Sequence, residues 1–205
     1  TDGIDIEYIG DREVTLNEEM NLGIVRFQNN ISRKDKRKVV HKLFVKSVKQ
    51  KYRISNKPKQ YKMNRVYVNE LNNNREEILD YSFSYADDIA VFAYSCKYDL
   101  GIDIVNPLRV QSTELKFFLS DEKVFRILKN PMFEISVLSW CIQEAVSKLE
   151  RTGLMKKYII IDVLKKEGYF KIFYSANDFD SIRSCNLLLF KFDYFCIATI
   201  FHIKD

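Results

Sequence analysis

A helix-length segment followed by strand-length apolar runs occurs twice along this chain of 205 residues, and this order limits its fold more than any other feature. The first helix is predicted over residues 34–51, where apolar residues recur at helical spacing, lysines fill the other face and Ser32 can cap the start. The second is predicted over residues 130–151, with Pro131 in its first turn and Gly153 as its C-cap. We therefore predict an α+β fold of two similar halves related by a pseudo-twofold, each a long helix packed on a small antiparallel sheet.

Strand-length runs fill much of the remaining chain. Because only a short loop separates the runs at 89–94 and 100–105, we expect these two strands to pair as an antiparallel hairpin. Residues 106–110, which begin with Asn106-Pro107, would then connect an N-terminal half at 1–106 to a C-terminal half at 107–205, with the active site between them. The other predicted strands are residues 66–68, 158–163, 169–174, 185–190 and 195–203, and shorter helices are predicted at 112–119 and 121–128.

Positive charge is concentrated in one segment. Residues 33–65 hold 14 Lys or Arg and one acid, Asp35, whereas the rest of the chain holds 19 bases and 27 acids. Such a segment binds phosphate groups or an acidic protein surface, unless it is only a solvated helix face. Its few aromatic residues and the lack of a known nucleic-acid-binding motif argue against nucleic acid as the partner.

Cysteine usage and hydropathy favour the cytoplasm. The four cysteines, at positions 96, 141, 185 and 196, form no closely spaced pair of the kind that holds zinc, so we interpret them as reduced and mostly buried thiols. No apolar run reaches the length of a membrane span, and no signal peptide precedes the charged start. We therefore expect a cytoplasmic protein with no membrane partner.

Few residues offer reactive groups. The chain has no glycine-rich phosphate loop and no G-x-S-x-G elbow, and with only His41 and His202 a histidine-based triad is not expected. Asp103 lies between two isoleucines near the end of a strand, where a charge is costly unless it is paired or binds a metal. Glu144 and Lys148 share one helix face. A carboxylate that caps a backbone amide and an ordinary i, i+4 ion pair would explain the same residues without any function.

The spacing of these acids carries a family resemblance. Gly101-Ile102-Asp103 is followed, with 41 positions from acid to acid, by Trp140-x-x-Gln143-Glu144-Ala145-x-x-Lys148. This order resembles the phosphopantetheinyl transferases of the surfactin-synthetase-activating type, whose pattern is G-[IV]-D and then W-x-x-K-E-[SA]-x-x-K. Further similarities, in the family's order, are residues 36–48 to its first long helix, Asn64-Arg65-Val66 to G-K-P, residues 81–86 to F-N-I-S-H-S, residues 118–122 to F-x-x-x-E and residues 193–198 to its closing strand. The resemblance thus spans residues 26–200.

The resemblance implies a transferase that moves phosphopantetheine from coenzyme A to a serine of an acyl or peptidyl carrier protein, with Mg²⁺ as cofactor. Asp103 and Glu144 would bind the metal ion, and Lys148 would stabilise phosphate charge in the transition state. Either Glu144 or Glu122 would accept the serine proton. The residues that would bind the coenzyme are Lys62, Arg65, Ser84, Tyr85 and Lys148. Carrier proteins are typically acidic, so the basic segment would speed their encounter with the enzyme.

The sequence also departs from the family pattern. Tyr85 stands where the family has a histidine that meets the 3′-phosphate of coenzyme A, and Val105 where the family often has a second acid. Gln143 and Arg65 stand in place of lysines. Tyr85 and Val105 favour an alternative, in which the chain keeps the fold and binds coenzyme A or a carrier protein without catalysing transfer. The intact set of Asp103, Glu144 and Lys148 opposes it. Gly3-Ile4-Asp5-Ile6-Glu7 also spells the first motif, but no matching helix follows at the right distance, so we interpret it as a coincidental strand.

Overall fold

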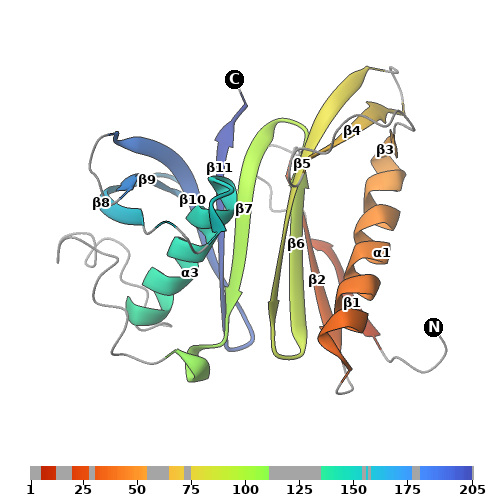
Figure 1. Ribbon diagram of the computed structural model, residues 1–205, viewed down its shortest axis with the longest axis horizontal. Helices are drawn as coiled ribbons and strands as arrows, with labels where there is room; N and C mark the ends of the chain where they lie inside the picture. Colours follow the sequence, from red (N-terminus) through yellow and green to blue (C-terminus); the bar gives the residue numbers. More distant parts are fainter. Residues whose placement is uncertain are drawn as a thin grey trace. The chain divides into compact units, whose positions relative to one another are not determined.

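The computed structural model describes residues 6–12, 20–27, 31–54, 65–71, 75–110, 135–153, 156, 158–176 and 181–204. The chain divides into two units, Thr1–Asp99 and Leu100–Asp205. Each unit contains a β-sheet and a helix that packs on it (Figure 1). The predicted mixture of helices and antiparallel sheet is confirmed, although the chain is richer in strand than predicted. The units divide near the start of β7 (Tyr98–Val105), whereas the sequence analysis puts the boundary after residue 106.

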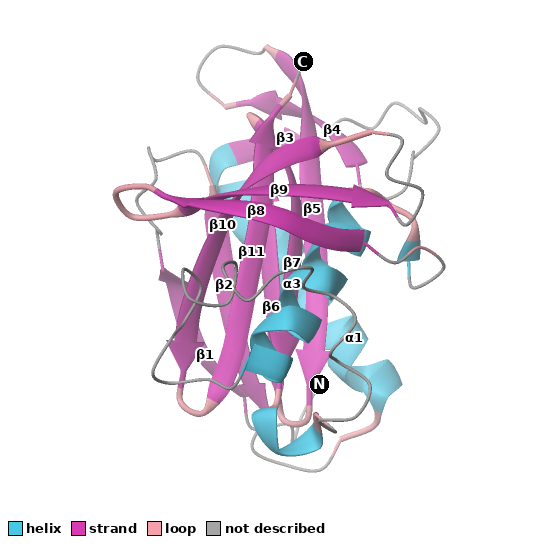
Figure 2. Cartoon of the chain, turned by 90° about the vertical axis from the view of Figure 1, so that its left-hand side faces the viewer, coloured by secondary structure: helices cyan, strands magenta, loops and turns pink. Residues whose placement is uncertain are grey.

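The first unit is a six-stranded sheet with helix α1 (Arg33–Lys51) on one face (Figure 2). All neighbouring strands in it are antiparallel. In sheet order, the strands are β1 (Ile6–Arg12), β2 (Asn21–Phe27), β6 (Ile89–Ser95), β5 (Glu76–Ala86), β4 (Arg65–Glu70) and β3 (Tyr52–Ile54). The predicted N-cap is confirmed, because Ser32 Oγ accepts a hydrogen bond of 3.2 Å from the Asp35 backbone nitrogen.

The core of the first unit forms where α1 meets the sheet. Phe44 of α1 contacts Tyr81 and Phe83 of β5, with ring centroids 4.9 and 5.2 Å apart, and also Phe92 and Tyr94 of β6. Because side chains alternate along a strand, the odd-numbered residues of this part of β5 face the helix and the even-numbered residues face the opposite side of the sheet.

The hairpin expected between residues 89–94 and 100–105 is wrong, although both segments are strands. The edges of β6 are already paired with β2 and β5, and β7 belongs to the other sheet. The actual hairpin joins β5 to β6 through the two-residue turn Asp87-Asp88, in which Asp87 has a positive φ of 49°. After β6, Ser95 Oγ accepts hydrogen bonds of 3.1 Å from the backbone nitrogens of Lys97 and Tyr98, which turns the chain.

The second unit is a five-stranded sheet with helix α3 (Ile135–Leu149) packed on it. The predicted strands in this part of the chain are confirmed. In sheet order, the strands are β7, β11 (Phe195–Ile203), β10 (Arg183–Phe192), β9 (Phe170–Ala176) and β8 (Tyr158–Lys165). Between β7 and α3 lies the short helix η1 (Pro107–Arg109), where Asn106 Oδ1 accepts a hydrogen bond of 2.9 Å from the Leu108 nitrogen.

The end of α3 differs in detail from the prediction. Arg151 adopts the left-handed conformation with φ 58°, and its nitrogen donates to the Lys148 carbonyl at 3.2 Å. The Thr152 nitrogen donates to the Ser147 carbonyl at 3.1 Å, which completes a Schellman motif. Arg151, and not the predicted Gly153, is therefore the residue that closes the helix.

Several predictions lie outside the described residues. They are the start of the second helix with Pro131, the helices at 112–119 and 121–128, and the side chains of Asp5, Lys62 and Glu122. Within the described ranges, no helix combines the length and the apolar character that crossing a membrane requires.

Candidate functional site

Gly101 determines how closely β7 and α3 approach each other. A Cβ atom at this position would lie 2.1 Å from the Ala145 carbonyl oxygen and 2.7 Å from the Leu149 backbone nitrogen. Both are backbone atoms of α3, which cannot move aside as the end of a flexible side chain can. A glycine is therefore required here, and it lets the second half of β7 lie directly against the last two turns of α3.

Asp103 and Lys148 form an ion pair between these two elements. Lys148 Nζ lies 2.7 Å from Asp103 Oδ1 and donates a second hydrogen bond, of 2.9 Å, to the Ile102 carbonyl oxygen. The Asp103 side chain is only 8% exposed, and that of Lys148 is 25% exposed. A nearly buried carboxylate is thus neutralised by a partly exposed ammonium, which explains how the charge is tolerated inside an apolar strand.

Glu144 lies one turn before Lys148 and is electrostatically coupled to the same pair. Burial, and then the negative charge of Asp103, raise the pKa of Glu144 to about 7, while the charge of Lys148 acts in the opposite direction. Glu144 Oε1 is buried and has no hydrogen-bond partner among the residues that the structure describes. The carboxyl group can therefore change its charge near neutral pH, and one of its oxygens has an unmet demand for a proton donor or a cation.

The chemistry of these groups fits a hard divalent cation. Mg²⁺ prefers carboxylate oxygens and usually keeps several waters, so two carboxylates are a sufficient protein contribution. The unpaired Glu144 Oε1 is an oxygen that such an ion would satisfy. No third His, Cys, Asp or Glu joins these two in the described part of the chain, and Val105, where the family often has an acid, is buried.

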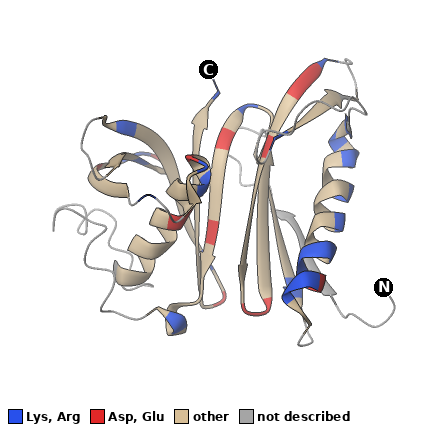
Figure 3. Ribbon diagram, viewed as in Figure 1, with Lys and Arg blue, Asp and Glu red and all other residues tan. Residues whose placement is uncertain are grey.

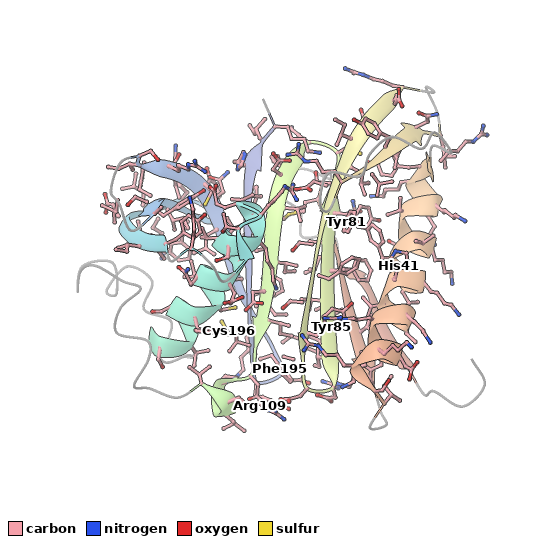
Figure 4. The ribbon with its side chains drawn as sticks, in the orientation of Figure 1. His41, Tyr81, Tyr85, Arg109, Phe195 and Cys196 are labelled. Carbon is pink, nitrogen blue, oxygen red and sulfur yellow. The ribbon has the colours of Figure 1, made fainter. Side chains whose placement is uncertain are left out.

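Cys141 lies beneath this group of charges and is not suited to act as a nucleophile. Its Sγ lies 3.5 Å from the carbonyl oxygens of both Asp103 and Cys196, so its single S–H can donate a weak hydrogen bond to either (Figure 4 labels Cys196). Burial raises the pKa of the Cys141 thiol well above its ordinary value. All four cysteines are free thiols, and three of them are buried, as predicted.

Gln143, which stands in place of a family lysine, has a structural role. It is buried, its Nε2 donates to the Lys156 carbonyl at 3.3 Å, and its Oε1 accepts from the Tyr158 nitrogen at 3.1 Å. The side chain thereby ties α3 to the start of β8. A lysine could donate the first bond but could not accept the second, so Gln143 meets a demand that the family residue could not.

Ser84 and Tyr85, both expected to bind the coenzyme, lie on opposite faces of β5. Ser84 is buried on the face that points away from α1. Tyr85 points toward α1, as does Tyr81 (Figure 4), and packs against the aromatic core. Burial raises the pKa of Tyr85, and the positive charges of Arg37 and Arg33 oppose this rise. The charges of two arginines of α1 therefore act on the Tyr85 hydroxyl, an influence that the family motif did not predict.

Arg65 is paired with carboxylates inside the first unit. Its Nη2 lies 2.6 Å from Asp99 Oδ1, and its Nε lies 4.0 Å from Oδ1 of the fully buried Asp80. A phosphate group would compete with these two acids for the guanidinium. Lys62, the other cation expected with Arg65, and Glu122, the second candidate base, lie outside the described residues.

The comparisons with known proteins give no relative for this chain: no family model matches it, and no curated protein matches it. Of the predicted site residues, the structure brings Asp103, Glu144 and Lys148 together in the second unit, and it places Arg65, Ser84 and Tyr85 in the first unit.

Proposed function

We propose that the protein is a Mg²⁺-dependent phosphopantetheinyl transferase that moves phosphopantetheine from coenzyme A to a serine of an acyl or peptidyl carrier protein. The observation that supports this most strongly is the grouping of Asp103, Glu144 and Lys148, which come from two motifs far apart in sequence. The glycine of the first motif adds support, because its lack of a side chain is what allows β7 to lie against α3.

The metal ion would be held by Asp103 and Glu144, with water and the coenzyme as its remaining ligands. When bound, Mg²⁺ supplies positive charge that offsets the charge of the pyrophosphate and of the leaving group. Asp103 provides a carboxylate fixed by its strand. Glu144 provides a buried oxygen that has no hydrogen-bond partner in the described part of the chain.

Proton transfer and phosphate binding would be divided between Glu144 and Lys148. As the carrier serine oxygen attacks phosphorus, a P–O bond of the pyrophosphate breaks and adenosine bisphosphate leaves. The serine must lose its proton in this step, and a carboxylate with a pKa of about 7 is suited to accept it near neutral pH, directly or through water. Glu122 remains the second candidate for this role. Lys148 would donate to a phosphate oxygen in the transition state and so stabilise the charge that develops there.

Coenzyme binding in the first unit would involve Tyr85 and the arginines beside it. If Tyr85 faces the 3′-phosphate, Arg33 and Arg37 can supply the positive charge that the family histidine would otherwise contribute. Arg65, Ser84 and Lys62 remain candidates for the pyrophosphate.

The carrier protein would be attracted by α1. Lys and Arg line this helix along its length (Figure 3), and most of their side chains are exposed. Acidic residues are rare here, since Asp35 is the one acid of α1 and takes part in its N-terminal cap. Such a surface raises the association rate of an acidic partner in a salt-dependent manner. A cytoplasmic location, where coenzyme A and apo-carrier proteins would be available, is part of the proposal.

A second candidate function is binding without transfer. The observation that favours it is that two of the cations expected to meet phosphate are paired within the chain: Lys148 with Asp103, and Arg65 with Asp99. In this case the protein would bind coenzyme A or a carrier protein as a module with little or no catalysis.

Mass spectrometry separates the two functions. The protein is incubated with coenzyme A, Mg²⁺ and a panel of apo-carrier proteins, and each carrier is examined for the mass gain of one phosphopantetheine. We expect a gain with at least one carrier, and its loss in Asp103→Ala and in Glu144→Ala, because one carboxylate holds Mg²⁺ poorly. Asp5→Ala, in the similar N-terminal motif, is the matched control and should keep the activity. No gain with any carrier, combined with measurable coenzyme A binding, would favour the binding module, and full activity of Asp103→Ala would refute the site.

A further inference from the structure

We propose that the Lys148 ammonium group occupies the place beside Asp103 where a divalent metal ion would bind, and that the metal ion must displace this group in order to bind. The inference rests on the proposed function, because it concerns the metal ion of that reaction. It assigns to Lys148 a role before catalysis, in addition to the contact with phosphate.

The contacts of the ammonium group resemble those of a small cation. Lys148 Nζ is held by two oxygens, Asp103 Oδ1 at 2.7 Å and the Ile102 carbonyl at 2.9 Å. The first of these belongs to a carboxylate that is nearly buried, so the ammonium, more than the solvent, offsets its charge. The close packing at Gly101 keeps the backbone of Lys148 beside β7, and the ammonium is thereby held at a high effective concentration.

Lys148 serves only one of the two carboxylates. Its ammonium donates to Asp103, whereas Glu144 Oε1 is buried without a hydrogen-bond partner. A divalent ion that contacted both acids would satisfy that oxygen. A divalent ion carries two positive charges, whereas the ammonium carries one. This difference in charge would drive the exchange.

The ammonium and the metal ion cannot share Asp103 without strong repulsion, since both are positive and both need an oxygen of the same small group. The lysine side chain is one-quarter exposed and has a flexible four-carbon stem, so it can move out toward solvent while the helix stays in place. Metal binding would thus release the Lys148 ammonium, which could then donate to a phosphate oxygen. The metal ion would bind to the site first, and the ammonium would contact phosphate second.

Manganese binding, followed by electron paramagnetic resonance of the free ion, tests the exchange without any transfer reaction. We compare the wild type, Lys148→Met, Lys148→Arg and the matched control Lys165→Met, which removes an exposed charge from β8 of the same unit. Lys148→Met should bind Mn²⁺ about tenfold more tightly or better, whereas the other two should stay close to the wild type. Unfolding curves for each variant establish that it is folded under the assay conditions.

A second measurement follows the exchange in the wild-type protein, and a variant serves only to assign the signal. In protein labelled with ¹⁵N-lysine and kept in chelator, the Lys148 ammonium should give a signal with slow proton exchange, assigned by its absence in Lys148→Arg. Added Mg²⁺ should abolish that protection. Metal binding with the signal unchanged, or with equal affinity in the wild type and a folded Lys148→Met, would overturn this inference alone. Failure of all four proteins to bind metal would overturn it together with the metal-dependent function.

Discussion

The raised pKa of Glu144 gives a test of the site that needs neither coenzyme nor carrier protein. In the metal-free protein, burial and Asp103 raise this pKa from 4.5 to about 7. Between these two values the folded state keeps a proton that the unfolded chain releases. The contribution of the group to stability is therefore fully present below the lower pKa and is lost as the pH rises through about 7. Replacing Glu144 by Gln removes the titrating group and should remove this loss.

The expected size follows from the same two pKa values. At 1.36 kcal/mol for each pH unit, their difference sets an upper limit of about 3.4 kcal/mol. Part of the side chain meets water, and solvent screening reduces the figure, so we expect about 1–2 kcal/mol. Glu144→Gln should thus be more stable than the wild type by about 1–2 kcal/mol at pH 8 and nearly equal to it at pH 5.

Urea unfolding between pH 5 and pH 8, in the presence of a chelator, measures this difference. Glu167→Gln, an exposed residue between β8 and β9, is the matched control and should follow the wild type over the whole range. Parallel pH profiles for the wild type and Glu144→Gln would refute the reasoning, because the charge of Glu144 would then cost nothing in the folded state. A variant less stable than the wild type at pH 8 would refute it as well.

Two further predictions concern the frame that holds the site. Gly101→Ala should lower the free energy of unfolding by about 3 kcal/mol, because its methyl group would meet the α3 backbone, and it should weaken Mn²⁺ binding by moving the helix. A loss below about 0.5 kcal/mol in urea unfolding would contradict the close packing of β7 on α3. Arg151→Gly should raise the melting temperature and add about 0.5–1 kcal/mol of stability, since glycine adopts the left-handed conformation without strain, whereas Arg151→Ala should bring no gain.

Much of the fold could be predicted from periodicity, and the errors have a common cause. The strands of the second unit and the N-cap at Ser32 follow from local patterns, and the structure has them. The pairing of β6 could not be obtained in this way. Two short turns flank this strand, at Asp87-Asp88 and at residues 96–97, and both are compatible with a hairpin. The choice between them depends on β2, which is distant in sequence and occupies the other edge of β6.

The charges of the candidate site could be predicted in part. The spacing of Asp103, Glu144 and Lys148 suggested that they meet, and they do interact. Which of them pair with each other was not visible, because a helical i, i+4 pair between Glu144 and Lys148 is as reasonable from sequence as the observed pair with Asp103. Which residues pair depends on how closely β7 packs against α3, and this packing is a property of the tertiary structure.

The departures from the family pattern also acquire physical reasons once their contacts are known. Gln143 binds the backbone at the start of β8 through both of its amide atoms, so exchange for lysine would leave a backbone nitrogen unpaired. Arg65 is held by Asp99 and lies near buried Asp80. Positive charge is instead available at Tyr85, from Arg37 and Arg33. Under the proposed function, the phosphate of an anionic coenzyme should therefore lie at α1, where these cations are, and the position of Tyr85 is decisive for that proposal.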